Sequence, residues 1–206
     1  MSSHRSANPL RVLVWGAALT LALLVGGVAA WQAFMPRASA LPVLGLGGEF
    51  SLPGSDGKAF RLADQRGRLV LLTFGYTSCP DVCPLTLARF RAVLAALGPD
   101  AVRLQPVMIS VDPDHDSPAR LDAYVRYFDP RIRGLTGTRE QLALVERQYG
   151  AMVSLPAPGT QGEVSHSDYL YLIDDLGRVR RLYDQQAPVQ DIVREARDLL
   201  REARWR

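Results

Sequence analysis

The sequence has few of the residues that form disulfides or bind soft metals. Its 206 residues include two cysteines, three histidines and four methionines. Two cysteines are too few for a disulfide framework, so the fold must depend on a hydrophobic core. No internal repeat is visible, which excludes a solenoid or a propeller. An apolar N-terminal segment leaves about 165 residues, and a chain of that size can bury one core without cross-links.

Acidic residues are absent from the first 40 positions, which carry three arginines. This leaves 21 of the 24 basic side chains to face 21 acidic side chains in the rest of the chain. The basic character of the whole chain therefore comes from its N-terminal segment. A balanced charge in the remainder does not indicate nucleic-acid binding, and we expect no nucleic-acid partner.

An uncharged, apolar run occupies Val12–Phe34. At about 1.5 Å per residue, a helix of this length can cross the hydrocarbon core of a membrane, which is about 30 Å thick. Arg5 and Arg11 precede the run and Arg37 follows it, so the positive-inside rule places the N-terminus in the cytoplasm. A signal peptide that is cleaved after Ala40 is the alternative. The apolar run is longer than that of an ordinary signal peptide, which favours a retained anchor.

These patterns divide the chain into four parts. They are a cytoplasmic N-terminus, a transmembrane anchor, a linker and a folded domain, at residues 1–11, 12–35, 36–48 and 49–206. The glycines and the proline near the end of the linker favour a flexible tether between the membrane and the domain.

Both cysteines lie in one short segment, which we expect to hold the chemistry of the protein. The apolar run Leu69–Phe74 is typical of a buried strand, and Cys79 and Cys83 follow it. Pro84 suits the first turn of a helix, and apolar residues continue at steps of three and four at Leu87, Phe90, Leu94 and Leu97. The cysteines are therefore predicted to lie on a strand-to-helix turn, with both sulfurs on one side.

This position has a chemical consequence. At the start of a helix, backbone N–H groups and the helix dipole favour the thiolate over the thiol. Thiolate is both a nucleophile and a metal ligand, so the turn indicates metal binding or redox chemistry. The alternatives are a structural disulfide and two buried, inert cysteines. A disulfide across so short a loop would restrict the unfolded chain little.

The remaining patterns predict strands that alternate with helices. Ser117 and Thr138 are predicted to cap two amphipathic helices that follow the second apolar strand. A hairpin and a C-terminal helix complete the chain, so that the further elements are Leu104–Val111, Tyr169–Ile173, Val179–Tyr183 and a helix from Val189 to Ala203. This order predicts an α/β domain in which helices flank a mixed central sheet. A cysteine motif after the first strand is typical of a thioredoxin-like fold.

Four segments, taken in order, resemble the Sco/SenC family of thioredoxin-like copper-delivery proteins. They are Phe74–Pro84, Ser110–Pro118, Gly134–Gly137 and Ser165–Asp174. The resemblance covers nearly all of residues 48–200. A Cys-x-x-x-Cys motif alone is weak evidence, but its combination with the Asp-Pro loop and the distal histidine is specific.

The resemblance implies that Cys79, Cys83 and His166 bind one copper ion per domain. This ligand set suits the metal, because soft sulfur favours Cu(I) and imidazole also suits Cu(II). The resemblance also implies delivery of copper to the dinuclear centre of subunit II of cytochrome c oxidase during its assembly. Other periplasmic copper carriers or thiol reductants are further expected partners. The expected location is a bacterial inner membrane, crossed once, with the domain facing the periplasm.

A second class of function is open to the same cysteines. A thiol:disulfide oxidoreductase would use Cys79 and Cys83 as its redox-active pair and would keep the cysteines of the recipient reduced. Thioredoxins carry Cys-x-x-Cys, and the extra residue here favours metal chelation over fast exchange. A peroxiredoxin-type peroxidase ranks last, because Tyr76 stands where its Thr-x-x-Cys motif needs threonine. We therefore expect a copper chaperone rather than an enzyme.

Several residues near these motifs depart from the family pattern or offer further ligands. His115 stands where the family usually has arginine, and we expect it to lie in a solvated turn. Ser165 stands where the family commonly has aspartate, a change that would alter how the next histidine is oriented. Met108 and Met152 lie in apolar runs and are predicted to be core residues. The acidic residues within 112–116 are predicted to form a capping turn and not a calcium loop.

Overall fold

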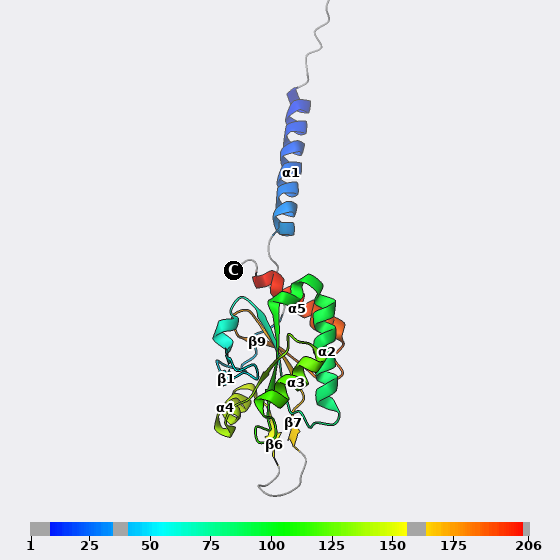
Figure 1. Ribbon diagram of the computed structural model, residues 1–206. Helices are drawn as coiled ribbons and strands as arrows, with labels where there is room; N and C mark the ends of the chain where they lie inside the picture. The colour runs from blue at the N-terminus through cyan, green and yellow to red at the C-terminus, as the bar shows by residue number, and fades with distance from the viewer. Residues whose placement is uncertain (1–8, 35–40, 156–163, 204–206) are drawn as a thin grey trace, which may run out of the picture. The chain divides into compact units, whose positions relative to one another are not determined.

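The computed structural model describes residues 9–34, 41–155 and 164–203. The chain divides into two compact units, residues 1–37 and residues 38–206. The first unit contains helix α1 (Pro9–Phe34), and the second contains all the other elements that the structure describes (Figure 1). We refer to the second as the folded unit.

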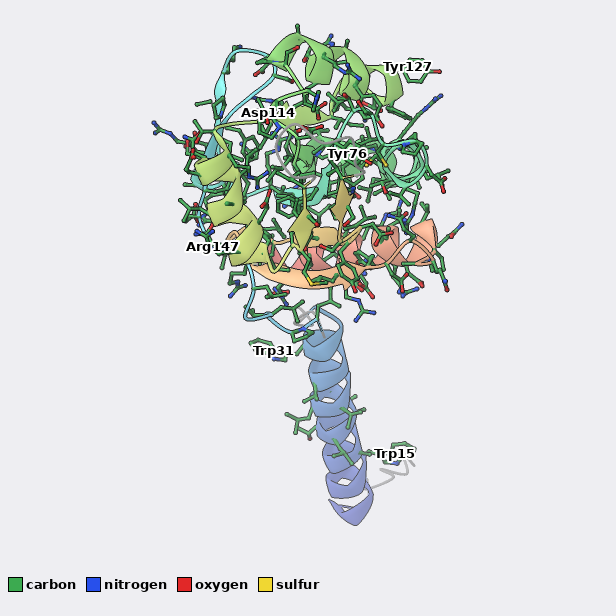
Figure 2. All side chains as sticks on the ribbon, turned by 90° about the horizontal axis from the view of Figure 1, so that it is seen from below. Trp15, Trp31, Tyr76, Asp114, Tyr127 and Arg147 are labelled. Carbon is green, nitrogen blue, oxygen red and sulfur yellow. The ribbon has the colours of Figure 1, made fainter. Side chains whose placement is uncertain are left out.

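Helix α1 is apolar over most of its length. Its 26 residues include one charged side chain, Arg11, and at about 1.5 Å per residue it is about 39 Å long. Trp15 and Trp31 project outward from the helix (Figure 2). Within α1, the apolar stretch of described residues is Ala18–Val28, which is shorter than a membrane span. One described stretch has the length and composition of a span, Val82–Arg103, but it belongs to the core of the folded unit.

A five-stranded mixed sheet forms the centre of the folded unit. Its order is β5-β4-β3-β8-β9, and the bounds of these strands are Arg133–Leu135, Leu104–Ser110, Leu69–Gly75, Leu170–Ile173 and Val179–Tyr183. Strands β3, β4 and β5 are parallel, while β8 and β9 run antiparallel to their neighbours. All seven residues of β3 are buried, which explains the continuous apolar sequence of this central strand. The predicted mixed sheet is confirmed.

Helices cover both faces of the sheet (Figure 1). Leu69 and Leu71 of β3 face one layer, which consists of α2, α3 and α5 (Val82–Leu97, Pro118–Phe128 and Val189–Ala203). Val70 and Leu72 face the other layer, which consists of α4 and the hairpin of β1 and β2 (Arg139–Tyr149, Ser51–Pro53 and Ala59–Arg61). Two 3-10 helices, η1 (Leu62–Gln65) and η2 (Gly98–Arg103), precede β3 and β4. The result is the predicted α/β, thioredoxin-like fold.

Two helices begin at the residues that the sequence predicts. Ser117 Oγ accepts a hydrogen bond from the backbone N–H of Arg120 (3.3 Å) at the start of α3. At the start of α4, Thr138 Oγ1 accepts from the backbone N–H of Gln141 (3.3 Å), and Gln141 Oε1 accepts from that of Thr138 (2.9 Å). Such bonds satisfy backbone donors that have no partner within a helix. Local sequence therefore determines where α3 and α4 begin.

The described part of the predicted linker, residues 41–48, is bonded to the folded unit. The backbone N–H of Leu44 donates to the carbonyl of Val179 in β9 (2.8 Å), and that of Gly47 donates to the carbonyl of Gln148 in α4 (2.7 Å). The flexible tether that the glycines suggest is therefore wrong for these residues, because long-range backbone bonds hold them. The preceding part of the predicted linker lies outside the described residues.

A buried ion cluster lies beside the turn between β8 and β9. Asp174 accepts hydrogen bonds from Arg178 Nη2 (2.7 Å) and Arg180 Nη1 (2.9 Å). Burial alone would raise the pKa of Asp174, but the bonds from both arginines outweigh it and lower the pKa below its usual value. Arg180 is also buried and donates to the carbonyl oxygen of Leu41 (2.6 Å). The cluster thereby joins the start of the folded unit to its sheet.

Candidate metal centre

Strand β3 and helix α2 position the two cysteines. The strand ends at Gly75 and the helix begins at Val82. Cys79 lies in the turn between them, where its backbone N–H donates to the carbonyl of Tyr76 (3.3 Å). Cys83 lies in the first turn of α2. The predicted strand-to-helix turn is therefore confirmed, and both cysteine side chains are buried.

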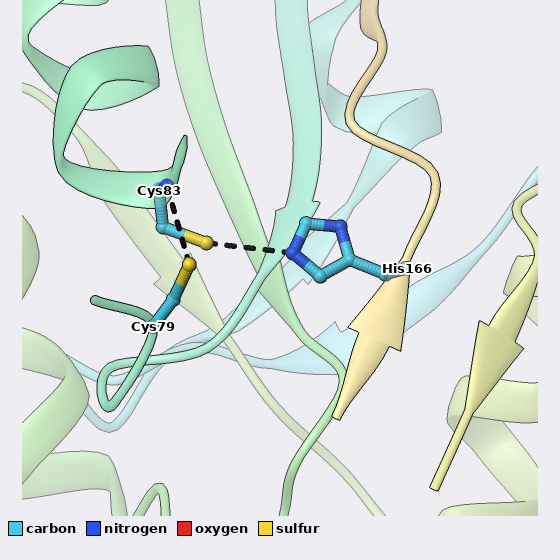
Figure 3. A group of neighbouring side chains, drawn as sticks. All are labelled: Cys79, Cys83 and His166. Carbon is cyan, nitrogen blue, oxygen red and sulfur yellow. Dashed lines mark hydrogen bonds between the residues drawn. The ribbon is translucent and has the colours of Figure 1, made fainter. Parts of the chain in front are cut away.

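Two sulfur atoms and one imidazole nitrogen lie close together in the folded unit (Figure 3). Cys83 Sγ is 3.5 Å from His166 Nε2, and the backbone N–H of Cys83 donates to Cys79 Sγ (3.4 Å). One ligand atom from each of the three residues lies within 4.8 Å of the other two. Both cysteines are free thiols, so the structural disulfide is not formed. Among the described residues, these three are the one group of histidine, cysteine and acidic side chains that could hold a metal ion.

His166 reaches the cysteines from a two-stranded ribbon outside the central sheet. The ribbon consists of β6 (Val153–Ser154) and β7 (Ser165–His166), which are antiparallel. His166 Nδ1 lies 3.1 Å from the carbonyl oxygen of Ser167, so Nδ1–H donates there and Nε2 keeps its lone pair for a metal ion. The ring of Tyr76 meets the imidazole edge to face at 5.9 Å. These two contacts hold Nε2 toward the sulfurs.

Gly75 leaves the space that the Cys83 sulfur occupies. A Cβ added at this position would lie 2.9 Å from Cys83 Sγ and 3.0 Å from the terminal methyl group of Met108. Both distances are shorter than ordinary van der Waals contact, so any larger residue would displace the sulfur or the methionine. Met108 is fully buried below the site, as predicted for a core residue.

A buried carboxylate holds the turn that precedes Cys79. Asp116 is 1% exposed. It accepts hydrogen bonds from the backbone N–H of Thr77 (3.1 Å) and from Ser110 Oγ (2.6 Å), and the Thr77 hydroxyl donates to the same carboxylate. Charged acceptors form stronger hydrogen bonds than neutral ones. The Asp-Pro loop after β4 is therefore a brace for the cysteine turn after β3.

Arg120 of α3 extends this brace at the surface. Its Nε donates to Thr77 Oγ1 (2.7 Å), and its Nη2 donates to Ser78 Oγ (2.9 Å). Local sequence patterns did not indicate Asp116 or Arg120 as supports of the site. The available signal was topological, because the loops that follow two neighbouring parallel strands lie at the same edge of the sheet.

The ionisation of Cys83 differs from the prediction. Burial raises the pKa of the Cys83 thiol far above its usual value, and a hydrogen bond from the backbone of Tyr76 offsets this only in part. The prediction that the helix start favours the thiolate is therefore wrong for this cysteine. A metal ion that binds Cys83 would need the thiolate and would therefore have to displace the proton.

The predictions for the other residues near these motifs have different outcomes. His115 is exposed, and its Nδ1 lies 2.9 Å from the carboxylate of Asp112, which raises the pKa of the imidazole. This is the predicted solvated turn. The prediction that Met152 is a core residue is wrong, because its side chain is 78% exposed. It precedes β6, whose ribbon lies outside the central sheet. Ser165 is also exposed and offers no carboxylate to the neighbouring His166.

Comparison with known families shows to which family the chain is related. The family model described as SCO1/SenC matches residues 40–201. The chain belongs to the SCO1/SenC family. The mitochondrial protein SCO2 of Saccharomyces cerevisiae is 35% identical to this SCO1/SenC chain over 196 residues, which cover 86% of the chain and 65% of the yeast protein. The chain therefore spans less than two thirds of that relative.

Solved structures of Sco proteins share the fold of the folded unit. Bradyrhizobium japonicum ScoI with copper bound is 33% identical, with a TM-score of 0.69, and the match covers 75% of this chain and 99% of ScoI. BsSco, a member of the Sco family of cytochrome c oxidase assembly proteins in which a disulfide switch was identified, is 25% identical, with a TM-score of 0.65. That match covers 78% of this chain and 96% of BsSco.

Proposed function

We propose that this SCO1/SenC protein is a membrane-anchored copper chaperone. It binds one copper ion through Cys79 Sγ, Cys83 Sγ and His166 Nε2, and it delivers the ion to the dinuclear copper centre of cytochrome c oxidase subunit II. The observation that carries the proposal is the convergence of the three ligand atoms within 4.8 Å, from segments that are more than eighty positions apart. Sco relatives with copper bound support the choice of metal.

The chemistry of the ligand set fits copper in both oxidation states. Two sulfur ligands favour Cu(I), and the imidazole is also a good ligand for Cu(II). With three protein ligands, a copper ion keeps a position for a ligand atom of the recipient. Transfer by ligand exchange needs such a position, because the new bond forms before the old ones break. The free thiols of Cys79 and Cys83 fit this role, since a disulfide offers no thiolate.

We propose that α1 anchors the protein in a bacterial inner membrane. Its 26 residues contain one charged side chain, Arg11, close to the N-terminal end. The arginines near that end favour a cytoplasmic N-terminus, which leaves the folded unit on the periplasmic side. The recipient's copper centre is assembled on that side. The anchor residues are 12–35, and the rival is a signal peptide cleaved after Ala40. The mass of the protein purified from membranes tests this, because cleavage would remove the first 40 residues.

A thiol:disulfide oxidoreductase is the second candidate function. It is favoured by the two free thiols and by their proximity, since the backbone N–H of Cys83 donates to Cys79 Sγ (3.4 Å). A disulfide switch in the relative BsSco also favours it. The burial of Cys83, which raises the pKa of its thiol, disfavours it, because the protonated form is a poor nucleophile. We therefore rank copper delivery first.

The deciding experiment is a titration of the full-length, reduced protein in detergent with Cu(I) and with Cu(II). We expect one copper per chain, and a sulfur-to-copper absorption band with Cu(II). Cys79→Ala and Cys83→Ala should each weaken copper binding and change this band, and the variant without either cysteine should lose it. His166→Ala should weaken binding and change the spectrum, while the matched control His115→Ala should change neither. An unchanged stoichiometry and spectrum in His166→Ala would reject the imidazole ligand.

Delivery is tested separately from binding. The copper-loaded protein is mixed with the metal-free, reduced copper domain of cytochrome c oxidase subunit II, and the absorption of the dinuclear centre is followed. Transfer predicts that this absorption grows as the chaperone loses copper. If the wild-type protein transfers no copper to the reduced domain but, in a parallel reaction without copper, reduces the disulfide of the oxidised domain, the oxidoreductase function replaces the delivery function.

A further inference from the structure

The hydroxyl group of Tyr124 is buried without a hydrogen-bond partner. Tyr124 lies in α3, and its Oη forms no hydrogen bond with any residue that the structure describes. Its ring packs edge to face against Phe128 at 5.5 Å. A buried hydroxyl without a partner destabilises the fold, and phenylalanine would pack equally well without this cost. The hydroxyl is therefore better explained by a role in the site than by stability.

Helix α3, which carries this hydroxyl, lies beside the cysteine turn and helix α2. Arg120 and Tyr124 are one helical turn apart on α3, so their side chains share a face. Arg120 donates to Thr77 Oγ1 and Ser78 Oγ, and Cys79 is the next residue. Helix α3 also contacts α2, whose first turn carries the second cysteine, and Tyr124 packs against the core cluster that includes Leu87 of α2.

The electrostatics of Tyr124 agree with this position. Burial raises the pKa of the Tyr124 phenol far above its usual value, and electrostatic repulsion from the thiolate forms of Cys83 and Cys79 and from the carboxylate of Asp116 would raise it further. Both sulfurs therefore lie within electrostatic reach of the phenol. A phenol at neutral pH retains its proton and can donate it in a hydrogen bond.

We infer that Tyr124 Oη donates a hydrogen bond to a thiolate sulfur of the Cys79 and Cys83 pair when the pair binds copper. The inference rests on the proposed copper-binding function. A thiol is a weak acceptor, whereas a metal-bound thiolate carries charge and is a strong one. The buried hydroxyl thus gains a partner as the sulfur loses its proton. Tyr124 is a positioning residue and not a ligand.

This hydrogen bond adjusts the balance between the two copper states. It withdraws electron density from the sulfur, so the sulfur donates less charge to the metal. The cupric state loses more from this than the cuprous state, and the Cu(II)/Cu(I) potential rises. The same effect stabilises the sulfur orbitals and moves the sulfur-to-Cu(II) absorption band to higher energy. Tyr124 therefore favours the cuprous form of the loaded protein.

The test compares Tyr124→Phe with Tyr127→Phe in the full-length protein. Tyr127 lies on the same helix, is 84% exposed and points away from the folded unit (Figure 2), so it is the matched control. We expect Tyr124→Phe to retain one copper, to lower the Cu(II)/Cu(I) potential and to move the absorption band to longer wavelength. Its cuprous affinity should fall about tenfold, the effect of one hydrogen bond to a charged sulfur. Tyr127→Phe should match the wild type.

Stability separates this role from a structural one. Before copper is added, Tyr124→Phe should unfold at the same temperature as the wild type or at a higher one. A potential and band identical to those of the wild type would overturn the inference. So would a lower unfolding temperature combined with an unchanged potential, because the hydroxyl would then serve only the fold.

If the wild-type protein binds no copper, the proposed function fails, and a different measurement tests Tyr124. The protein disulfide and two glutathione thiols are equilibrated with the protein dithiol and one glutathione disulfide. The hydrogen bond needs a thiolate acceptor, so the equilibrium is measured at a pH at which one thiol of the reduced pair is ionised, and there Tyr124→Phe should shift it toward the protein disulfide. An unchanged equilibrium would overturn the inference in this case too.

Discussion

The two ends of the central strand β3 hold buried polar groups of opposite character. At its start, beside the turn between β8 and β9, Asp174 is paired with Arg178 and Arg180, and Arg180 also lies 3.4 Å from Glu202. At its end, the Cys83 thiol is held neutral by burial, and the Tyr124 hydroxyl has no partner among the described residues. Buried polar groups that are paired with one another stabilise the fold. Buried polar groups that lack hydrogen-bond partners are available to a ligand.

The strongest way to break this contrast is Asp174→Ala. This change leaves Arg180 buried without its main partner, and we expect the free energy of unfolding to fall by about 3–5 kcal/mol. Urea denaturation of the reduced protein measures the loss. Asp198→Ala, which removes an exposed partner of Arg201, should cost less than about 1 kcal/mol. Equal losses of unfolding free energy in the two variants would show that the buried cluster stabilises the fold no more than an exposed ion pair does.

Asp116→Asn tests the carboxylate that braces the cysteine turn at the other end of β3. The amide keeps the shape of the side chain but loses the charge that Thr77 and Ser110 bond to. We expect a fall of about 10- to 100-fold in copper affinity, which is the usual effect of removing a residue that orients metal ligands. Competition with a chelator of known affinity measures it. Asp114→Asn, in the exposed part of the same loop, is the control, and a variant of Asp116 with wild-type affinity would contradict the brace.

Gly75→Ala tests the space beneath the Cys83 sulfur. The new methyl group would lie 2.9 Å from Cys83 Sγ, so the sulfur must move. We expect a loss of about 1–3 kcal/mol in the free energy of unfolding, as for other overpacked cores, together with weaker copper binding. Gly45→Ala is the matched control, since no atom lies within 4 Å of its added Cβ. Copper affinity and stability equal to those of the control would show that the site accommodates the added methyl group without displacing the sulfur.

Acid should weaken the start of β3 through Asp174. Its folded-state pKa is lowered, so the unfolded state binds a proton more readily than the folded state does. The stabilisation is fully present above the unfolded-state pKa of about 3.9 and is lost as the pH falls through the folded-state value. The difference in urea midpoint between wild type and Asp174→Ala should therefore shrink below about pH 4. A constant difference down to pH 2 would exclude Asp174 as the titrating group.

Much of the fold could be predicted from the sequence because its signals are local. The apolar run of β3, the caps at Ser117 and Thr138, and the helical spacing after Pro84 each act within a few residues. The structure has all of them. The predicted linker shows the limit of such signals, because its glycines indicate flexibility while the bonds of Leu44 to β9 come from a distant strand.

The candidate site was predictable only in part. The cysteine turn follows from local pattern, whereas His166 joined it through family resemblance, since no periodicity relates residues so far apart. The ionisation of Cys83 could not be predicted, because burial depends on how α2 packs and outweighs the helix start. The exposure of Met152 could not be predicted for a similar reason. It lies in an apolar run, but it is exposed because the adjoining ribbon lies outside the central sheet.

The ribbon of β6 and β7 has a consequence for the order in which a metal ion would leave. The sulfurs belong to a turn braced by Asp116 and to a helix packed on the sheet. The imidazole belongs to a strand of two residues that pairs, within the described chain, with another of two residues. A recipient that displaces this ribbon would break few hydrogen bonds and would free the imidazole nitrogen, while the two thiolates would stay bound to the metal ion. We therefore expect hand-over to begin at the nitrogen and to finish at the sulfurs.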